Sequence, residues 1–235
     1  MTFGARLGIL GGTLDPVHVG HIETALAARD ALALDRVLLL PSRVPPHRTL
    51  QPSASPFHRF AMAALAVNGV EGVEVSDVEL TTPGTSYTAD TLEQFHTSGF
   101  QPSQIFFILG ADAFAEIETW HRYPRVLELA NFVVVSRPGH DSHLIVQGLP
   151  ALSGRFAPTT AAGATGTADT RIFIIPATTT DVSSTEIRRR LRSAEPVTGL
   201  VRETVERHLR QHRLYLDDGS STLIHSAADH LHGEN

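Results

Sequence analysis

The chain of 235 residues carries a formal net charge of -6 and contains no cysteine and no lysine, so all 19 of its basic residues are arginine. These absences exclude disulfides, thiolate zinc sites, cysteine nucleophiles, the lysine of a P-loop and Schiff-base catalysis, and the acidic balance argues against a nucleic-acid-binding surface. The length suits a single domain, and no apolar run approaches the roughly 20 residues that a membrane span needs. The chain opens on a predicted strand rather than on a signal peptide with a charged and then an apolar region, so we expect a cytoplasmic protein.

Strands and helices are expected to alternate along the chain. In order, the pattern predicts strand 6–10, helix 20–34, strand 36–40, helix 56–68, a strand from Val73, helix 88–96, strand 104–109, helix 123–130, strand 131–136 and strand 171–175. The continuously apolar runs VLLL and FFIL are typical of buried parallel strands. The alternation predicts an α/β fold, a Rossmann-like, doubly wound parallel sheet with helices on both faces, whose ligands lie beyond the carboxyl ends of the strands.

The first strand runs directly into the sequence GGTLDPVHVGH at residues 11–21. Gly11 and Gly12 allow the backbone to approach a ligand closely, and the free N–H groups of the helix that follows attract anions. His18 and His21 are three residues apart, so they share one helical face and can reach the same phosphoryl group. The whole pattern predicts a polyphosphate site, although each residue alone also suits a strand–turn–helix with two surface histidines.

Two segments interrupt the alternation. Residues 141–170 include TTAAGATGTADT, which is too weakly apolar to pack, and we expect a mobile surface loop there. Residues 217–235 are expected to be a disordered tail, which leaves 1–216 as one domain.

A second helix start follows the last predicted strand, in the sequence DVSSTEIRRRL. Ser183 and Glu186 have the spacing of a capping box, which alone predicts only a well-started helix. However, Ser183, Ser184 and Thr185 also bring hydroxyls and free amides to this helix start, and Arg188 follows one turn later. The combination indicates a second phosphate site.

Both motifs resemble those of the nucleotidyltransferase superfamily that carries an HxGH motif. In that superfamily the two histidines hold the α-phosphate region of ATP, and Leu14 stands here where phenylalanine is usual. The second motif, serine-x-threonine-x-isoleucine-arginine, binds the β- and γ-phosphates, and it is matched by Ser183, Thr185, Ile187 and Arg188. The resemblance implies that residues 1–216 form the nucleotidyltransferase type of the predicted fold.

Further motifs are PPHR at 45–48, SYTADT at 86–91, LGAD at 109–112, a tryptophan at 120 and SRPG at 136–139. They narrow the resemblance to the bacterial nicotinate-nucleotide adenylyltransferases, which join nicotinate mononucleotide to AMP. The likeness runs from about residue 6 to residue 216. His121 departs from the tyrosine that is common in the family, and Val201 departs from a proline.

The resemblance also implies a role for each site residue. The expected catalytic residues are His18, His21 and Arg188. ATP is expected to contact Gly11, Gly12, Thr13, Gly110, Asp112, Ser183, Ser184 and Thr185. The pyridine ring of nicotinate mononucleotide is expected to contact Tyr87, Thr88 and Trp120, and anionic groups of the substrates are expected to contact His47, Arg48 and Arg137. Taken singly, the tryptophan also suits a core position, SYT an ordinary helix cap and PPHR a stiff turn.

The chemistry favours direct transfer. A nucleotide 5′-phosphate is largely dianionic at neutral pH, with a second pKa near ~6, so it can attack the α-phosphorus of ATP without a general base. The expected task of the protein is positioning and charge stabilisation: His18 and His21 donate to the α-phosphoryl oxygens, and Arg188 holds the leaving pyrophosphate with the helix start at Ser183. Mg²⁺ is expected to arrive with ATP, because no carboxylate cluster predicts a metal held by the protein.

The pyridine pocket predicts a preference for the acid over the amide. If a helix begins after Ser86, the backbone N–H groups of Tyr87 and Thr88 can donate to a pyridine carboxylate at the positive end of that helix. An amide would present its NH₂ to a donor instead.

Three alternatives remain open from the sequence. Another acceptor, such as nicotinamide mononucleotide or phosphopantetheine, is compatible with the ATP motifs, although phosphopantetheine offers no aromatic ring for Trp120. A non-catalytic nucleotide-binding module should have lost one of the histidines, and both are present. A metal site at HxxH lacks a third ligand positioned by the sequence. Oligomeric state is not predicted.

Overall fold

The computed structural model describes residues 5–46, 52–136, 146–159 and 169–216. Its strands are β1 (Leu7–Gly12), β2 (Arg36–Pro41), β3 (Val73–Val75), β4 (Ile105–Gly110), β5 (Asn131–Ser136), β6 (Phe156–Ala157) and β7 (Ile172–Pro176). Its α-helices are α1 (Val19–Leu32), α2 (Pro56–Val67), α3 (Val78–Thr81), α4 (Thr88–Thr97), α5 (Ala111–Ala115), α7 (Ser184–Arg192) and α8 (Glu203–Gln211). Short 3-10 helices span Pro102–Gln104, Ile117–Thr119, Arg125–Glu128 and Pro150–Arg155.

All described strands join one parallel sheet in the order β3-β2-β1-β4-β5-β7-β6. β1 is central: Leu10 pairs with Leu39 of β2 on one side and with Ile108 of β4 on the other. The order of the strands reverses between β1 and β4, and in such sheets ligands bind at this point, beyond the carboxyl ends. The predicted doubly wound parallel sheet is confirmed.

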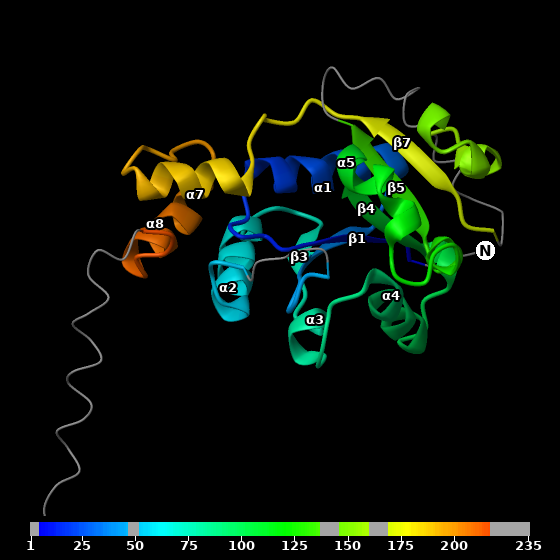
Figure 1. Cartoon of the computed structure of the whole chain (residues 1–235), viewed down its shortest axis with the longest axis horizontal. Coiled ribbons are helices and arrows are strands. Elements are labelled where there is room, and N and C mark those ends of the chain that lie inside the picture. The colour runs from blue at the N-terminus through cyan, green and yellow to red at the C-terminus, as the bar shows by residue number, and fades with distance from the viewer. Residues whose placement is uncertain (1–4, 47–51, 137–145, 160–168, 217–235) are drawn as a thin grey trace, which may run out of the picture.

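Side chains alternate across the sheet, so each central strand contributes to two hydrophobic cores. In β4, Phe106 and Ile108 pack into the core that is covered by α1, α2, α7 and α8, whereas Ile105, Phe107 and Leu109 pack into the core that is covered by α4 and α5. Figure 1 shows α1 above β1, and α3 and α4 below it. Helices therefore cover both faces, as predicted.

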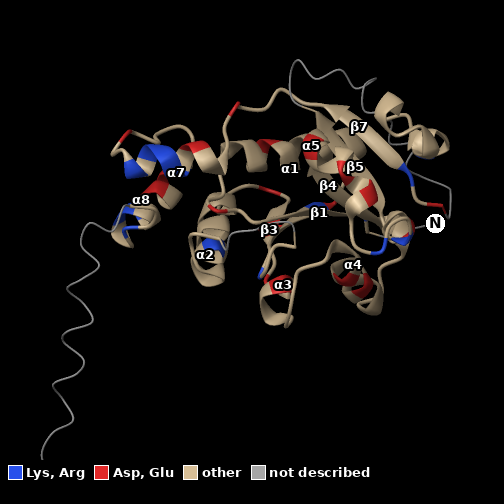
Figure 2. Cartoon of the chain, in the orientation of Figure 1, with Lys and Arg blue, Asp and Glu red and all other residues tan. Residues whose placement is uncertain are grey.

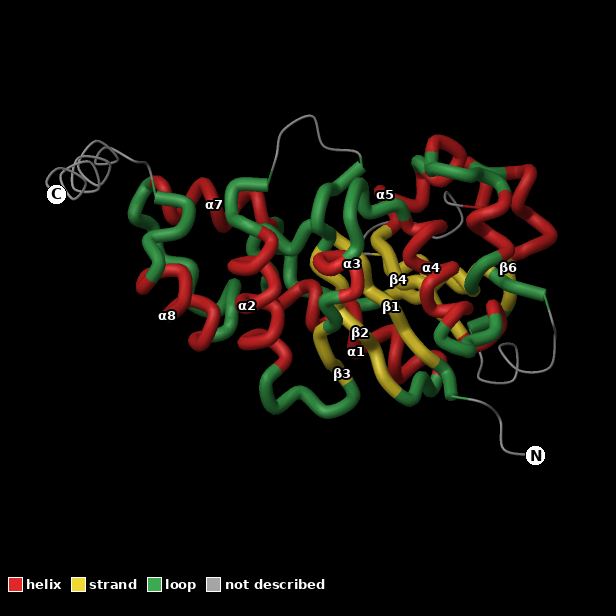
Figure 3. The backbone as a smooth tube through the Cα atoms, turned by 90° about the horizontal axis from the view of Figure 1, so that it is seen from below, coloured by secondary structure: helices red, strands yellow, loops and turns green. Residues whose placement is uncertain are grey.

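The C-terminal helices gather at one end of the molecule. Figure 3 shows α2, α7 and α8 together, beside the strands. The hydroxyl of Thr204 in α8 donates to the carbonyl of Leu65 in α2 (3.0 Å), and the N–H of Val19 at the start of α1 donates to the carbonyl of Leu200 (3.0 Å). The C-terminal helices are thus tied to the helix that follows the glycine motif.

Two predictions about elements are wrong. The helix expected over 123–130 is only a 3-10 turn at Arg125–Glu128. The loop expected over 141–170 contains a 3-10 helix at Pro150–Arg155 and the strand β6, which pairs with β7, and Leu152 is buried. Residues 137–145 and 160–168, like the predicted tail at 217–235, lie outside the described residues. No helix in the described ranges is long and apolar enough to cross a membrane.

Candidate active site

Two cavities of about 370 Å³ each lie beyond the carboxyl ends of β1 and β4 and share Gly11, Leu109 and Ala113 in their walls. The phosphate pocket is further lined by Leu10, His18, Gly20, His21, Thr24, Gly110, Ala111, Asp112, Val135, Thr179, Thr180, Val182, Ser183, Ser184 and Thr185. The aromatic pocket is further lined by Gly12, Thr13, Ser42, Pro45, Pro46, Glu79, Ser86, Tyr87, Thr88, Phe107, Trp120 and His121. Because the pockets share Gly11, ligands in the two can meet beside this residue.

The histidine pair stands at the start of α1. The rings of His18 and His21 have centroids 3.7 Å apart, with an angle of 30° between their planes. The backbone N–H of His18 donates to Nδ1 of His21 (3.1 Å), so a neutral His21 carries its proton on Nε2. His18 is buried and His21 half-buried. The pair therefore offers the phosphate pocket an N–H donor whose tautomer is fixed by the backbone.

The second helix start faces the same pocket. Ser183 is the N-cap of α7, and its hydroxyl accepts from the N–H of Glu186 (3.1 Å). α7 and α1 both begin at the phosphate pocket, and helix starts bring free N–H groups and the positive ends of their dipoles. These two helix starts and the histidine pair make the pocket suitable for a chain of phosphates.

The predicted capping box of α7 is only half formed. The Glu186 carboxylate does not return to the N-cap; it accepts from Arg189 and Arg190 (2.8 Å each), and these guanidinium groups lower its pKa to about 2. Figure 2 shows basic residues concentrated on α7. Arg189 also pairs with Glu195 (2.6 Å), so the charges of this exposed face are balanced locally.

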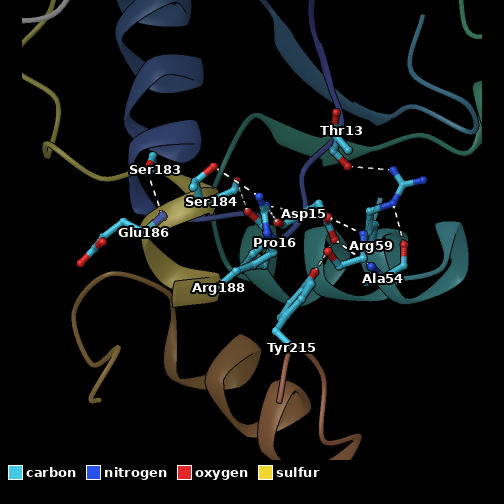
Figure 4. Close-up of polar contacts among 12 residues, drawn as sticks. Thr13, Asp15, Pro16, Ala54, Arg59, Ser183, Ser184, Glu186, Arg188 and Tyr215 are labelled. Carbon is cyan, nitrogen blue, oxygen red and sulfur yellow. Dashed lines mark hydrogen bonds and ion pairs between the residues drawn. The ribbon is translucent and has the colours of Figure 1, made fainter. Parts of the chain in front are cut away.

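Arg188 joins the two motifs. Its Nη1 donates to the carbonyl of Asp15 (2.6 Å) and its Nη2 to the hydroxyl of Thr185 (3.3 Å), and its side chain is 13 % exposed. Nearby, the hydroxyl of Ser184 donates to the carbonyl of Pro16 (2.8 Å). Figure 4 shows these contacts between α7 and the loop before α1. Arg188 is thus not in the wall of the phosphate pocket itself but contacts Thr185 of that wall and residues 13–18 between β1 and α1, which we call the motif loop.

A buried arginine, which the sequence analysis did not predict as a site residue, holds together the loops beside the candidate site. Arg59 in α2 is fully buried, and its guanidinium donates to the carbonyls of Thr13 (2.8 Å), Ser42 (2.6 Å), Ala54 (3.2 Å) and Arg43 (3.2 Å). One side chain therefore ties together the motif loop, the loop after β2 and the segment that leads into α2. Figure 4 shows its contacts with Thr13 and Ala54. A single arginine within the apolar run PFHRFAMAALAV was the available signal.

The aromatic pocket brings together the residues predicted for the pyridine ring. The ring of Tyr87 stacks on that of His121, with centroids 4.1 Å apart and planes at 28°. Trp120 meets Phe107 edge-on, with centroids 6.0 Å apart. α4 begins at Thr88, as predicted, with Tyr87 at its N-cap. His121 was noted in the sequence only as a departure from the family.

The backbone donors of this pocket differ from the prediction. The N–H of Tyr87 donates to the carbonyl of Thr85 (3.0 Å), so it is already used, whereas Thr88 stands at the first position of α4, whose N–H has no acceptor within the helix. Glu79, which the sequence did not indicate, is a buried carboxyl in the wall; it accepts from Thr91 (2.8 Å), and burial raises its pKa. Protonation of Glu79 is therefore favoured relative to an exposed glutamate.

The structure groups the predicted residues into two sets. Gly11, His18, His21, Gly110, Asp112, Ser183, Ser184 and Thr185 line the phosphate pocket. Gly12 and Thr13, expected at ATP, line the aromatic pocket with Tyr87, Thr88 and Trp120. His47, Arg48 and Arg137 lie outside the described residues. Within the described ranges, no group of three or more histidine, aspartate or glutamate side chains is arranged to hold a metal ion.

Solved structures share this fold. Nicotinic acid mononucleotide adenylyltransferase of Plasmodium falciparum, complexed with NaAD, superposes with a TM-score of 0.67 at 15% identity and covers 90% of this chain and 97% of its own. A putative nicotinate-nucleotide adenylyltransferase from Vibrio parahaemolyticus gives a TM-score of 0.55 at 18% identity and covers 91% of this chain and 96% of its own. At these identities the likeness establishes the fold.

Relatives found by sequence have a higher identity to this chain than these solved structures have. The cytidylyltransferase-like family matches residues 9–190. A probable nicotinate-nucleotide adenylyltransferase of Desulfatibacillum aliphaticivorans is 38% identical over 225 residues, covering 90% of this chain and 100% of the relative. One from Roseiflexus sp. (strain RS-1) is 39% identical over 211 residues, covering 90% and 98%. The chain therefore belongs to the nicotinate-nucleotide adenylyltransferases, within the cytidylyltransferase-like family.

Proposed function

We propose that this protein transfers AMP from ATP to nicotinate mononucleotide, giving nicotinate adenine dinucleotide and pyrophosphate in the cytoplasm. The observation that carries the proposal is the pair of cavities that share Gly11, one lined by aromatic rings and the other by a histidine pair and two helix starts. A pyridine nucleotide in the aromatic pocket directs its 5′-phosphate toward the α-phosphate of ATP in the phosphate pocket. The names of the sequence relatives support the same reaction.

The reaction is a single in-line displacement. An oxygen of the nicotinate mononucleotide phosphate attacks the α-phosphorus of ATP, and the bond from that phosphorus to the bridging oxygen of pyrophosphate breaks. The attacking phosphate is already an anion, so no side chain has to remove a proton. Nε2–H of His21, with His18 beside it, donates to the α-phosphoryl oxygens as their negative charge grows.

The leaving pyrophosphate lies at the start of α7. Ser183, Ser184 and Thr185 supply hydroxyls and amides there, and Arg188 holds α7 against the motif loop and supplies positive charge next to Thr185. ATP enters as its magnesium complex. Asp112 is the one carboxylate among the described residues that line the phosphate pocket, and the proposal assigns the magnesium to the substrate ATP.

The aromatic pocket favours the acid. The N–H of Thr88 at the positive end of α4 meets one carboxylate oxygen of the pyridine ring, and Tyr87, with His121 stacked on it, borders the ring. An amide that turns its NH₂ toward this donor leaves a buried polar group unsatisfied, which costs ~1–3 kcal/mol. We therefore expect a preference of at least ~10-fold for nicotinate mononucleotide over its amide.

An assay of pyrophosphate release with a panel of acceptors tests the proposal. Purified protein receives MgATP with nicotinate mononucleotide, nicotinamide mononucleotide, phosphopantetheine or no acceptor, and His21→Ala serves as the negative control. We expect the highest kcat/KM with nicotinate mononucleotide. Equal values for acid and amide would show that the pocket is misinterpreted, and absence of release with every acceptor would favour a non-catalytic nucleotide-binding module.

A further inference from the structure

The Asp15 carboxylate is a buried anion that the proposed reaction does not use. It lies in the loop between β1 and α1, is 1% exposed, and accepts from the backbone N–H groups of Ser53 (2.8 Å) and Ala54 (3.0 Å). Nη1 of Arg188 lies 3.8 Å from its Oδ2. These contacts attach the motif loop to the segment before α2 on one side and to α7 on the other.

The last partner of Asp15 comes from the far end of the described chain. The hydroxyl of Tyr215, which follows α8, donates to Oδ1 of Asp15 (2.6 Å) across 200 residues of sequence (Figure 4). Burial and the neighbouring Asp15 charge raise the pKa of Tyr215, so its phenol is protonated and donates at neutral pH. A short bond from a phenol to a buried carboxylate is among the stronger hydrogen bonds in proteins.

Both ends of this contact have unusual backbone. Leu14, next to Asp15, has φ 50° and Tyr215 has φ 64°, and both are non-glycine residues in the left-handed region. Such conformations are unfavourable for residues with a Cβ and persist where the surroundings fix them. The two strained residues therefore mark a contact that the fold holds in one geometry.

The loop held by Tyr215 carries the phosphate ligands of the proposed reaction. Asp15 precedes His18 by three residues, its carbonyl accepts from Arg188, and the next carbonyl, of Pro16, accepts from Ser184 of α7. A shift of Asp15 therefore changes the distance between the histidine pair and the start of α7. A misplacement of about 1 Å in such an arrangement can reduce a rate by up to ~10²-fold.

We propose that Tyr215 is a positioning residue for adenylyl transfer, which acts through Asp15 to place His18 and His21 against the start of α7. The inference rests on the proposed function. It assigns the C-terminal segment after α8 a role in the chemistry at the opposite end of the sequence, although Tyr215 is not among the residues that line either pocket.

Tyr215→Phe in the full chain removes only the hydroxyl. We expect kcat to fall about 10-fold and the affinity for a non-hydrolysable ATP analogue to fall about 5-fold, while the KM for nicotinate mononucleotide stays within about 2-fold, because the aromatic pocket keeps its walls. Tyr123→Phe is the matched control, since it also removes a tyrosine hydroxyl bonded to a carboxylate, Glu118 (3.3 Å), and it should leave all three values unchanged.

A second variant, Asp15→Asn, tests the route. If Tyr215 acts through Asp15, the kcat of the double variant Tyr215→Phe/Asp15→Asn should be little lower than that of the more impaired single variant. If the two residues act independently, the fold-reductions in kcat of the two single variants should multiply in the double variant. A folded single variant with a lower melting temperature but unchanged kcat and unchanged affinity for the analogue overturns the inference. Fold-reductions in kcat that multiply in the double variant overturn it as well. Wild-type protein that binds the analogue but releases no pyrophosphate contradicts the proposed function alone, and the analogue affinities of the variants still decide the role of Tyr215.

Discussion

The two motif histidines differ in their surroundings, and the difference should appear in their variants. His18 is 8% exposed and caps α1, whereas His21 is half-buried and receives the backbone N–H of His18. We expect either His18→Ala or His21→Ala to lower kcat by ~10²–10³, the usual cost of losing one preorganised donor. Only His18→Ala should also lower the melting temperature clearly, because it removes buried ring contacts. His96→Ala, outside both pockets, is the control, and a well-folded His21→Ala with near-normal kcat would remove His21 from the mechanism.

Whether the sequence could indicate a functional residue depends on how far along the chain that residue lies from the residues it contacts. His18, His21 and Ser183 carry local motifs, and their grouping in one pocket follows from the rule that parallel strands present their carboxyl ends to ligands. Tyr215 contacts a partner 200 residues away, so no local pattern could indicate it, whereas the one local signal for Arg59 is that it is a single arginine within an apolar run. Burial of a charged group becomes visible only when the chain is folded.

At the scale of elements, the contact between α2 and α8 carries three histidines and should respond to pH. His58 Nδ1 and His208 Nε2 lie 3.1 Å apart, and the ring of His212 lies 4.4 Å from that of His208. Burial, with the nearby His212 and His58, lowers the pKa of His208 from its ordinary 6.5. The unfolded chain therefore takes up a proton at a higher pH than the folded one, so stability is complete above pH 6.5 and declines as the pH falls from 6.5 toward the lowered pKa.

Melting temperatures measured from pH 8 to pH 5 test this expectation. Wild-type protein should lose more stability below pH 6.5 than His208→Gln, which cannot take up a proton at that position. His96→Gln is the control for loss of a histidine elsewhere. Identical pH profiles for wild type and His208→Gln would contradict the argument.

Element boundaries followed from the sequence where local pattern and packing agree. β5 was predicted at its observed bounds, and β4 within one residue, because continuous apolar runs suit strands buried on both faces. β6 was missed, since its two residues are held as a strand only by pairing with β7 at the sheet edge. Arg125–Glu128 has helical composition but closes only a 3-10 turn after Pro124. For β6, pairing within the sheet rather than propensity decides the conformation.

At the scale of the whole molecule, the phosphate pocket joins segments that are far apart in sequence. His18 belongs to the start of α1, Gly110 to the start of α5 and Ser183 to the start of α7. Any ligand that contacts all three binds the folded chain and not the unfolded one. The binding energy is therefore added to the stability of the fold.

This linkage gives the last prediction. A non-hydrolysable ATP analogue at 100 times its Kd should add ~2.7 kcal/mol to the free energy of unfolding, which for a chain of this size raises the melting temperature by about 5–10 °C. At one fixed concentration the shift should decrease from the triphosphate analogue to AMP to adenosine, because each phosphate removed takes away contacts with the histidine pair or with the start of α7. His21→Ala should reduce the shift given by the analogue and leave that of adenosine unchanged, since adenosine carries no phosphate. Equal shifts for analogue and adenosine in the wild-type protein would show that the phosphates contribute nothing here, and that the cavity lined by His18, His21 and Ser183 holds another part of the nucleotide.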